Sequence, residues 1–279
     1  MRFASVRNDT AQSVCWSTVS PLTYSEHAWL YDAAFSWDVS QEVAWLVSRF
    51  RAGAKRLIEP GCGSGRMMPD FARHGIEVVG IDASKPMLAR AAARMRAAGL
   101  PTPALICADM VEFSLDAAVD GALCSIQTFA HLKTRDDALR HLSCVRRALR
   151  PGGKYLVQLG LEDTGVFRAA GRPNEASAWV VEVAGRKIRT SWFGRDFDPR
   201  TLIQYEVCRF EVLSGEGAGS VFEDMHEMHV WSWAAWSDVI RDAGFQQTAA
   251  FDGREDSRPP VEPGEHLNDQ PLMWHELCV

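Results

Sequence analysis

The chain has 279 residues, 47% of them hydrophobic, which is enough for one large domain or for a domain with an added subdomain. Its formal net charge is −6 and no basic block interrupts the sequence, so nucleic acid is not an expected partner. The seven cysteines are odd in number and irregularly spaced, which favours buried free thiols in a reducing compartment. No run approaches the ~18 apolar residues of a membrane span, and the N-terminus lacks the apolar core of a signal peptide. A cytoplasmic protein without membrane contact is therefore predicted.

Helical and strand-like runs alternate along the first half of the chain. Helical spacing of apolar residues predicts helices at 39–50, 65–75, 84–99 and 134–153, the third with Ser84 as its N-cap. Short apolar runs predict strands at 55–61, 76–82, 103–109, 120–127 and 154–160. Because the connections are short, the strands are expected to be parallel, with helices on both faces of the sheet.

The pattern changes after residue 160, where β-branched and aromatic residues alternate with polar ones. Antiparallel strands are predicted at 178–193, 201–213 and 219–231. A helix at 233–245, a strand at 246–251, a polar loop at 253–270 and a last strand at 272–279 follow. The chain thus combines a parallel α/β core with a β-rich segment.

Three glycines at alternate positions follow the first predicted strand and open a helix. Gly61, Gly63 and Gly65 occupy the place where doubly wound folds bind nucleotides, and glycine there lets a ligand approach the backbone. A dinucleotide loop has the pattern G-x-G-x-x-G, but its last position here is Arg66. Since S-adenosylmethionine (SAM) has no pyrophosphate to bind at a helix end, the mismatch favours SAM.

Two acidic residues lie at the ends of the next two strands. Asp82 stands about twenty residues past the glycine loop, where a carboxylate can accept both ribose hydroxyls. Asp109 can accept from the adenine amino group, with Met110 packed on the ring; the alternative is a helix N-cap. A dehydrogenase does not need this second acid, so Asp109 also favours SAM.

Together these motifs resemble those of class I SAM-dependent methyltransferases. "LIEPGCGSGR", "VVGIDASKPML", "CADM", "DGALCSIQTFAHL" and "LRPGGKYLV" match in order and spacing over residues 55–160. "YDAAF" at 31–35 resembles the N-terminal cap of small-molecule members, including sugar N-methyltransferases and natural-product enzymes. The resemblance implies an α/β fold with a seven-stranded, mostly parallel sheet of order 3-2-1-4-5-7-6, an antiparallel last strand and a β-rich insertion after strand five.

The resemblance also implies a division of the chain and a set of cofactor contacts. The expected segments are an N-terminal helical cap (1–53), the SAM-binding core (54–160), an acceptor-side insertion (161–231) and a closing helix with strands six and seven (232–279). The cofactor contacts carried over are Tyr31, Glu59, Gly61, Gly63, Asp82, Ala83, Met87, Asp109, Met110 and Gln127. Glu59 would orient the amino-acid end of SAM, and Gln127 would line the methionine moiety.

Candidate acceptor residues come from outside the core motifs. Tyr24 and Tyr31 are seven residues apart and would share a helix face. His131 follows strand four, where it could act as a base near neutral pH; a structural role at a helix start is the alternative. Four tryptophans precede residue 46 and six follow residue 178, so they either line an acceptor pocket or fill the insertion core. The "HEMH" run at 226–229 places its two histidines on opposite strand faces, so no metal site is predicted; His229 or Glu227 could face the pocket.

The predicted function is in-line transfer of a methyl group from SAM to a nitrogen, oxygen or carbon of a small acceptor. An aromatic or heteroaromatic, natural-product-like acceptor is favoured, and S-adenosylhomocysteine is the other product. Two alternatives stay open at this point: an NAD(P)-dependent oxidoreductase and a non-catalytic SAM-binding protein. Whether the chain acts alone or as a homodimer also stays open.

Overall fold

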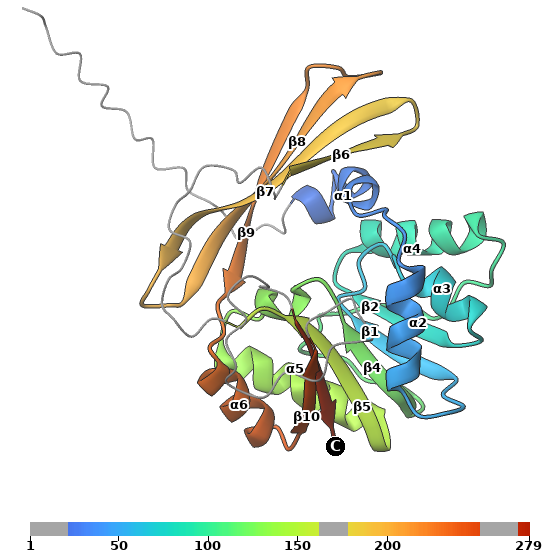
Figure 1. Cartoon of the computed structure of the whole chain (residues 1–279), viewed down its shortest axis with the longest axis vertical. Coiled ribbons are helices and arrows are strands. Elements are labelled where there is room, and N and C mark those ends of the chain that lie inside the picture. The colour runs from blue at the N-terminus through green and yellow to red at the C-terminus, as the bar shows by residue number, and fades with distance from the viewer. Residues whose placement is uncertain (1–21, 162–177, 252–272) are drawn as a thin grey trace, which may run out of the picture.

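The computed structural model of the chain describes residues 22–161, 178–251 and 273–279. Its strands form a seven-stranded and a four-stranded sheet (Figure 1). The strands are β1 (Arg56–Pro60), β2 (Glu77–Asp82), β3 (Leu105–Cys107), β4 (Val119–Cys124), β5 (Leu149–Leu159), β6 (Ala178–Val183), β7 (Arg186–Asp198), β8 (Ile203–Ser214), β9 (Val221–His229), β10 (Gln246–Phe251) and β11 (Met273–Cys278). The helices are η1 (Leu22–Tyr24), α1 (Ala28–Ala34), α2 (Ser40–Arg49), α3 (Met68–Arg73), α4 (Lys85–Ala97), η2 (Thr128–His131), α5 (Arg135–Ala148) and α6 (Trp233–Asp242), where η denotes a 3₁₀ helix.

The seven-stranded sheet has the order β3-β2-β1-β4-β5-β11-β10. Its strands are parallel except β11, which runs antiparallel to both β5 and β10. Numbering only the strands of this sheet along the chain gives 3-2-1-4-5-7-6, because β6–β9 belong to the other sheet. The predicted α/β fold class and its strand order are confirmed.

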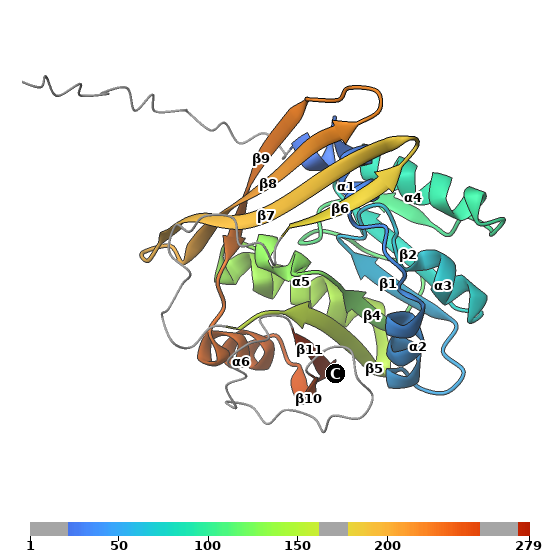
Figure 2. The same cartoon turned by 45° about the horizontal axis from the view of Figure 1, so that its top comes forward.

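Helices cover both faces of this sheet, as the apolar runs of its strands predict. Neighbouring residues of β1 point to opposite faces: Leu57 packs with α2, α3 and α4, whereas Ile58 packs with α5 and α6. Figures 1 and 2 show these two helix layers on either side of the sheet. Three of the described helices begin at side-chain caps: Ser84 accepts from the Met87 N–H (3.2 Å), Thr134 from the Asp137 N–H (3.1 Å) and Ser232 from the Ala235 N–H (3.1 Å).

Two local differences from the sequence-based expectation have clear causes. Helix α5 ends at Ala148 rather than 153, because the residue before Pro151 disfavours helical backbone and β5 has already begun. Residues 150–153 then bulge out of the β4–β5 ladder. The predicted strand 178–193 is in fact a hairpin, β6–β7, whose two-residue turn places Ala184 and Gly185 at positive φ (49° and 73°).

The four-stranded antiparallel sheet, β6-β7-β8-β9, leans over the core with α1 beneath it (Figure 2). Leu30 and Phe35 of the α1 segment pack with Ile188, Cys208 and Phe210 of this sheet. On the opposite side, Asp32 of α1 forms ion pairs with Arg90 (2.7 Å) and Arg94 of α4. The α1 segment therefore joins the second sheet to the core.

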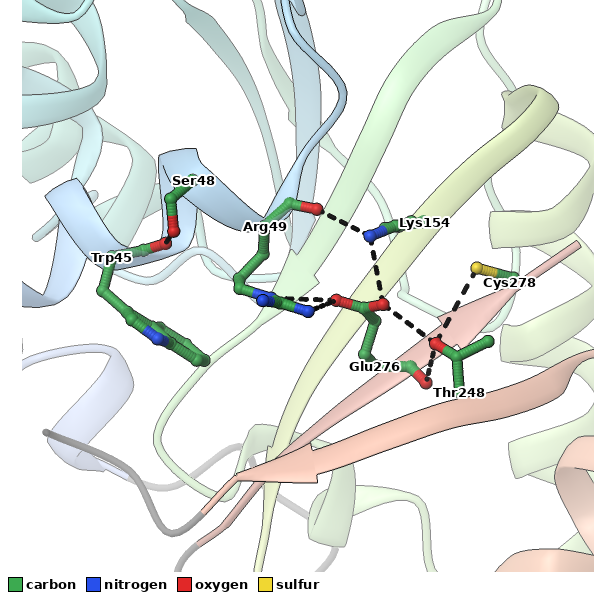
Figure 3. Close-up of polar contacts among 7 residues, drawn as sticks. All are labelled: Trp45, Ser48, Arg49, Lys154, Thr248, Glu276 and Cys278. Atoms are coloured by element: carbon green, nitrogen blue, oxygen red, sulfur yellow. Dashed lines mark hydrogen bonds and ion pairs between the residues drawn. The ribbon is translucent and has the colours of Figure 1, made fainter. Parts of the chain in front are cut away.

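A buried carboxylate on β11 links several elements at the β10 end of the seven-stranded sheet (Figure 3). Glu276 of β11 accepts from Arg49 of α2 (2.9 Å) and Thr248 of β10 (2.9 Å), and pairs with Lys154 of β5 (3.0 Å). Burial alone would raise the Glu276 pKa, but these three partners outweigh it and lower the pKa. The network ties a helix and three strands together on the side away from the glycine loop.

The predicted loop 253–270, Trp16 and the first 21 residues of the expected N-terminal cap lie outside the described residues. The expected division of the chain into four segments stays a prediction. Within the described ranges, every helix is too short or too polar to cross a membrane.

Candidate functional site

The glycine loop leaves β1 and turns sharply before α3. Gly61, Gly63 and Gly65 all have positive φ (72°, 53° and 66°), a conformation that residues with a Cβ rarely adopt. A Cβ on Gly61 would lie 2.4 Å from the Thr128 side chain, and one on Gly65 would lie 2.7 Å from the Met68 sulfur. A Cβ on Gly63 would meet nothing within 4 Å. Gly61 and Gly65 thus allow close packing, whereas Gly63 borders open space.

Asp82, the last residue of β2, holds this loop in place. One carboxylate oxygen accepts from the Gly63 N–H (2.8 Å) and the other from the Ser84 N–H (2.8 Å). Burial is the main influence on this carboxyl and raises its pKa, although the two backbone bonds oppose the shift. The carboxylate is therefore oriented before any ligand binds.

The segment after β3 lies beside Asp82. The Asp109 carboxylate accepts from the Val111 N–H (3.0 Å), and the Met110 carbonyl contacts His141 Nδ1 (2.9 Å). Because a carbonyl only accepts, Nδ1 carries the proton, and burial lowers the His141 pKa to about 4 so that the ring is neutral. Its Nε2 therefore accepts from the Tyr155 hydroxyl (2.7 Å). The two buried hydrogen bonds of His141 thus support the loop that carries Asp109.

A cavity of about 420 Å³ lies at the carboxyl ends of β1, β2 and β3, the usual ligand position in doubly wound sheets. Its lining residues are Tyr24, Tyr31, Gly61, Gly63, Asp82, Ala83, Met87, Asp109, Met110, Val111, Thr128, His131, Leu132, Lys133 and Asp137. Ten of the twelve predicted site residues are among them, and their roles stay predictions. A larger groove of about 780 Å³, between α5 and the segment after β3, contains none of the twelve.

Glu59 and Gln127 are the two predicted site residues that do not line this cavity. Glu59, at 3% exposure, accepts from the Ser125 hydroxyl (3.1 Å) with one oxygen, while its other oxygen has no partner among the described residues. Burial raises its pKa to about 7, although the Ser125 bond and the Arg66 charge oppose the shift. The Gln127 amide oxygen instead accepts from the Gly160 N–H (2.8 Å).

Tyr24 and His131 are neighbours among the residues that line the cavity. The Tyr24 hydroxyl and His131 Nε2 are 3.2 Å apart, and the Tyr24 ring lies edge-on to Tyr31 with centroids 5.3 Å apart. Burial raises the pKa of both tyrosines and lowers that of His131 to about 3, with His226 and Lys133 adding to the latter shift. At neutral pH His131 is therefore an uncharged hydrogen-bonding group, and its expected role as a base stays a prediction.

His226 is a neighbour of these two residues that the sequence analysis did not select. It is 1% exposed, its ring lies 5.1 Å from Tyr24 and 4.7 Å from Trp192, and neither ring nitrogen has a partner among the described residues. Neither Glu227 nor His229 lines the cavity, although Glu227 pairs with Lys133, which does; His229 contacts Trp231. The sequence does hold a signal for His226. Side chains alternate between the two faces of β9, and those at even-numbered positions face the N-terminal cap.

Four of the nine tryptophans in the described ranges are buried, and none of the nine lines the cavity. Trp231, Trp236 and Trp274 are each at most 2% exposed and belong to the two clusters that pack against the main sheet. Trp192 stacks on His226, whose ring lies beside the cavity residue Tyr24.

Comparison with known proteins agrees with this geometry. Residues 57–153 match the model of a family described as a methyltransferase domain. A putative methyltransferase of Bacillus subtilis, YqeM, is 28% identical over 209 residues, which span 72% of this chain and 79% of that protein. A SAM-dependent methyltransferase from Clostridium acetobutylicum has the same fold, with a TM-score of 0.70, 16% identity, and coverage of 91% of this chain and 98% of that one.

This chain is a class I SAM-dependent methyltransferase. Another protein similar to this chain is a dTDP-4-amino-2,3,4,6-tetradeoxy-D-glucose N,N-dimethyltransferase of Saccharopolyspora spinosa. It is 29% identical over 139 residues, which span 48% of this chain and 54% of that protein. The family assignment replaces the oxidoreductase and non-catalytic alternatives.

The residues of the methyltransferase site fit SAM. The free space beside Gly63 leaves room for a ligand against the loop, and an ionised carboxylate can accept more than the one bond that each Asp82 oxygen already makes. The unpartnered oxygen of Glu59 suits a group with N–H donors, such as the SAM ammonium.

Proposed function

We propose that this methyltransferase modifies a small acceptor held between Tyr24, His131 and the four-stranded sheet. The observation that carries the proposal is the composition of the cavity. The glycine loop, Asp82 and Asp109 line the same cavity as Tyr24 and His131. In this proposal the first group forms the donor wall and the second forms the acceptor wall, so a donor and an acceptor would meet within one cavity, which is the arrangement that a two-substrate transfer requires.

In this proposal the first wall binds the donor. Asp82 accepts the ribose hydroxyls, Asp109 and Met110 contact the adenine, and Glu59 pairs with the ammonium group. When bound, SAM supplies a methyl group on a positively charged sulfur, from which a lone pair can displace it in line. Tyr31 closes the cavity over the donor and helps to exclude water.

The second wall favours an aromatic or heteroaromatic acceptor, natural-product-like in size and methylated at nitrogen, oxygen or carbon. The ring centroids of Tyr24 and His131 are 5.7 Å apart and the two rings are nearly perpendicular. The His226 ring contacts both, so the wall presents ring edges and faces. Burial keeps both histidines uncharged, since it lowers the pKa of His226 to about 4 and that of His131 to about 3. A flat, uncharged ring would match this wall in shape and polarity.

A second acceptor class, amino sugars, is supported by a different observation. The Saccharopolyspora spinosa relative is by its name an N,N-dimethyltransferase of an amino sugar nucleotide. The similarity covers only 54% of that protein, so it does not carry the substrate over to this chain. We therefore keep an amino sugar acceptor as a second, separate proposal.

A transfer screen with labelled SAM tests both classes. Purified protein is incubated with tyramine, 4-hydroxyindole, catechol, aniline and glucosamine, and products are detected by mass and label. We expect label in at least one aromatic compound. Label confined to glucosamine would overturn the aromatic proposal in favour of the sugar, and calorimetry showing NAD binding without SAM binding would overturn methyl transfer itself.

A further inference from the structure

A buried hydrogen-bonded contact joins the segment before α1 to the four-stranded sheet. Thr23 is 1% exposed, and both its backbone N–H and its hydroxyl donate to the same carboxylate oxygen of Asp224, each at 2.6 Å. Asp224 lies on β9, 201 positions further along the chain. Hydrogen bonds to a charged acceptor are about twice as strong as neutral ones. This contact is therefore a strong link between two distant parts of the chain.

The next residue, Tyr24, carries this link into the donor cavity. Its carbonyl accepts from the Ser84 hydroxyl, and the Ser84 N–H donates to Asp82. Its hydroxyl meets His131, and its ring faces His226. Tyr24 thus contacts the donor wall through its backbone and the second sheet through its ring.

The sheet offers a firm support behind this residue. His226 stacks on Trp192 with an interplanar angle of 25°, and the Trp192 ring N–H donates to Glu206. The other Glu206 oxygen accepts from the Gln204 amide (3.1 Å). Each ring behind Tyr24 is therefore held by another contact on the same sheet.

We infer that Asp224 is a positioning residue, which holds Tyr24 over the donor cavity by binding Thr23. Asp224 does not line that cavity, so its effect on the donor passes through the Thr23–Tyr24 segment. The four-stranded sheet therefore contributes to SAM affinity without touching SAM. The inference rests on the proposed function, because it assumes that Tyr24 borders the bound donor.

The test is the affinity of the full-length protein for SAM, measured by calorimetry. Thr23→Val removes the hydroxyl donor and Asp224→Ala removes the acceptor. Asp224→Ala removes both bonds and frees about one residue that SAM binding must then order, so we expect affinity to fall about 10-fold; Thr23→Val keeps the backbone bond, so we expect a smaller fall of about 3- to 5-fold. Thr23→Ser keeps the hydroxyl and should stay within about 2-fold of the wild type. The matched control is Glu223→Gln, since Glu223 is the neighbour of Asp224 on β9 but is exposed and paired with Arg209.

The double variant Thr23→Val/Asp224→Ala should bind SAM no more weakly than Asp224→Ala alone, because both changes break one contact. Hydrogen exchange adds a second readout: Asp224→Ala should speed exchange at residues 22–35 and leave the seven-stranded sheet unchanged. If Asp224→Ala fails to fold, the comparison of Thr23→Val with Thr23→Ser decides.

Two results would overturn this inference. One is wild-type affinity in Thr23→Val and Asp224→Ala, and the other is an equal loss in Thr23→Ser and Thr23→Val. If the wild-type protein itself failed to bind SAM, the proposed function would fall instead.

Discussion

We predict that Glu59 makes the affinity for SAM depend on pH. Its carboxyl is 3% exposed, and burial raises its pKa to about 7 despite the opposing Ser125 bond and Arg66 charge. If the SAM ammonium pairs with this group, only the ionised carboxylate binds tightly. Binding then releases a proton, and affinity rises with pH through the pKa of the free protein.

The magnitude follows from the ionised fraction of Glu59. With a pKa of about 7, roughly 3% of the protein is ionised at about pH 5.5 and roughly 75% at about pH 7.5. SAM affinity should therefore rise roughly 25-fold across this range. The ordinary α-amino pKa of about 7.7–8.0 lies just above this window, so roughly 60–75% of the SAM amino group is still charged at about pH 7.5, which reduces the expected rise to about 15- to 19-fold.

Calorimetry of SAM binding at several pH values, in buffers of different ionisation enthalpy, measures both the slope and the proton release. Glu59→Gln should remove the slope and weaken binding about 10-fold at the upper pH, because a charged partner is lost. Glu223→Gln, far from the loop on an exposed strand position, should keep the wild-type slope. A flat profile in the wild type, or an unchanged slope in Glu59→Gln, would refute the pairing of Glu59 with the ammonium.

Three further substitutions separate donor binding, turnover and stability. Asp82→Ala should weaken SAM about 10- to 100-fold by calorimetry, since it removes the expected ribose contact; unchanged affinity would place the ribose elsewhere. His131→Phe keeps the ring but loses the bond to Tyr24, so turnover of the best acceptor from the screen should fall about 10-fold with SAM affinity intact. A much larger loss, with a wild-type pH limb near 6.5, would instead identify His131 as a base. Glu276→Ala should lower stability by about 2 kcal/mol, and the melting temperature by about 4–8 °C, with SAM affinity unchanged. A wild-type melting temperature would mean that the network contributes nothing net.

The sequence predicted those parts of the fold and site that depend on local signals. The glycine loop, Asp82 and Asp109 each follow a short apolar run, and parallel strands bring their carboxyl ends to one edge of the sheet. The sheet order came from the family resemblance and agrees with the structure. Position along the chain was therefore enough to gather ten of the twelve predicted residues around one cavity.

The remaining contacts depend on pairings between distant segments. Thr23 meets Asp224 only because the cap lies under the second sheet and because β9 pairs with β8 in one register, Glu206 opposite His226. A shift of one residue would turn Asp224 and His226 to the outer face. No local pattern specifies that register. The hairpin at Ala184–Gly185 was missed from the sequence for a related reason. Its turn depends on the positive φ of both residues, which the alternation of apolar and polar residues does not reveal.

The charge states around Tyr24 indicate how this methyltransferase achieves transfer. Burial lowers the pKa of both histidines on this wall and raises that of Tyr24 and of Glu206 behind it, so every one of these groups resists becoming charged. A group with a pKa of about 3 or 4 is a weak base that stays almost entirely unprotonated at neutral pH. In the proposed function this wall therefore holds the acceptor in line and excludes water, and does not remove its proton. Because the methyl donor is already activated, alignment is the contribution that a methyltransferase most needs. The residues that set the position of Tyr24, including Asp224, should then influence turnover as much as the residues that touch the acceptor.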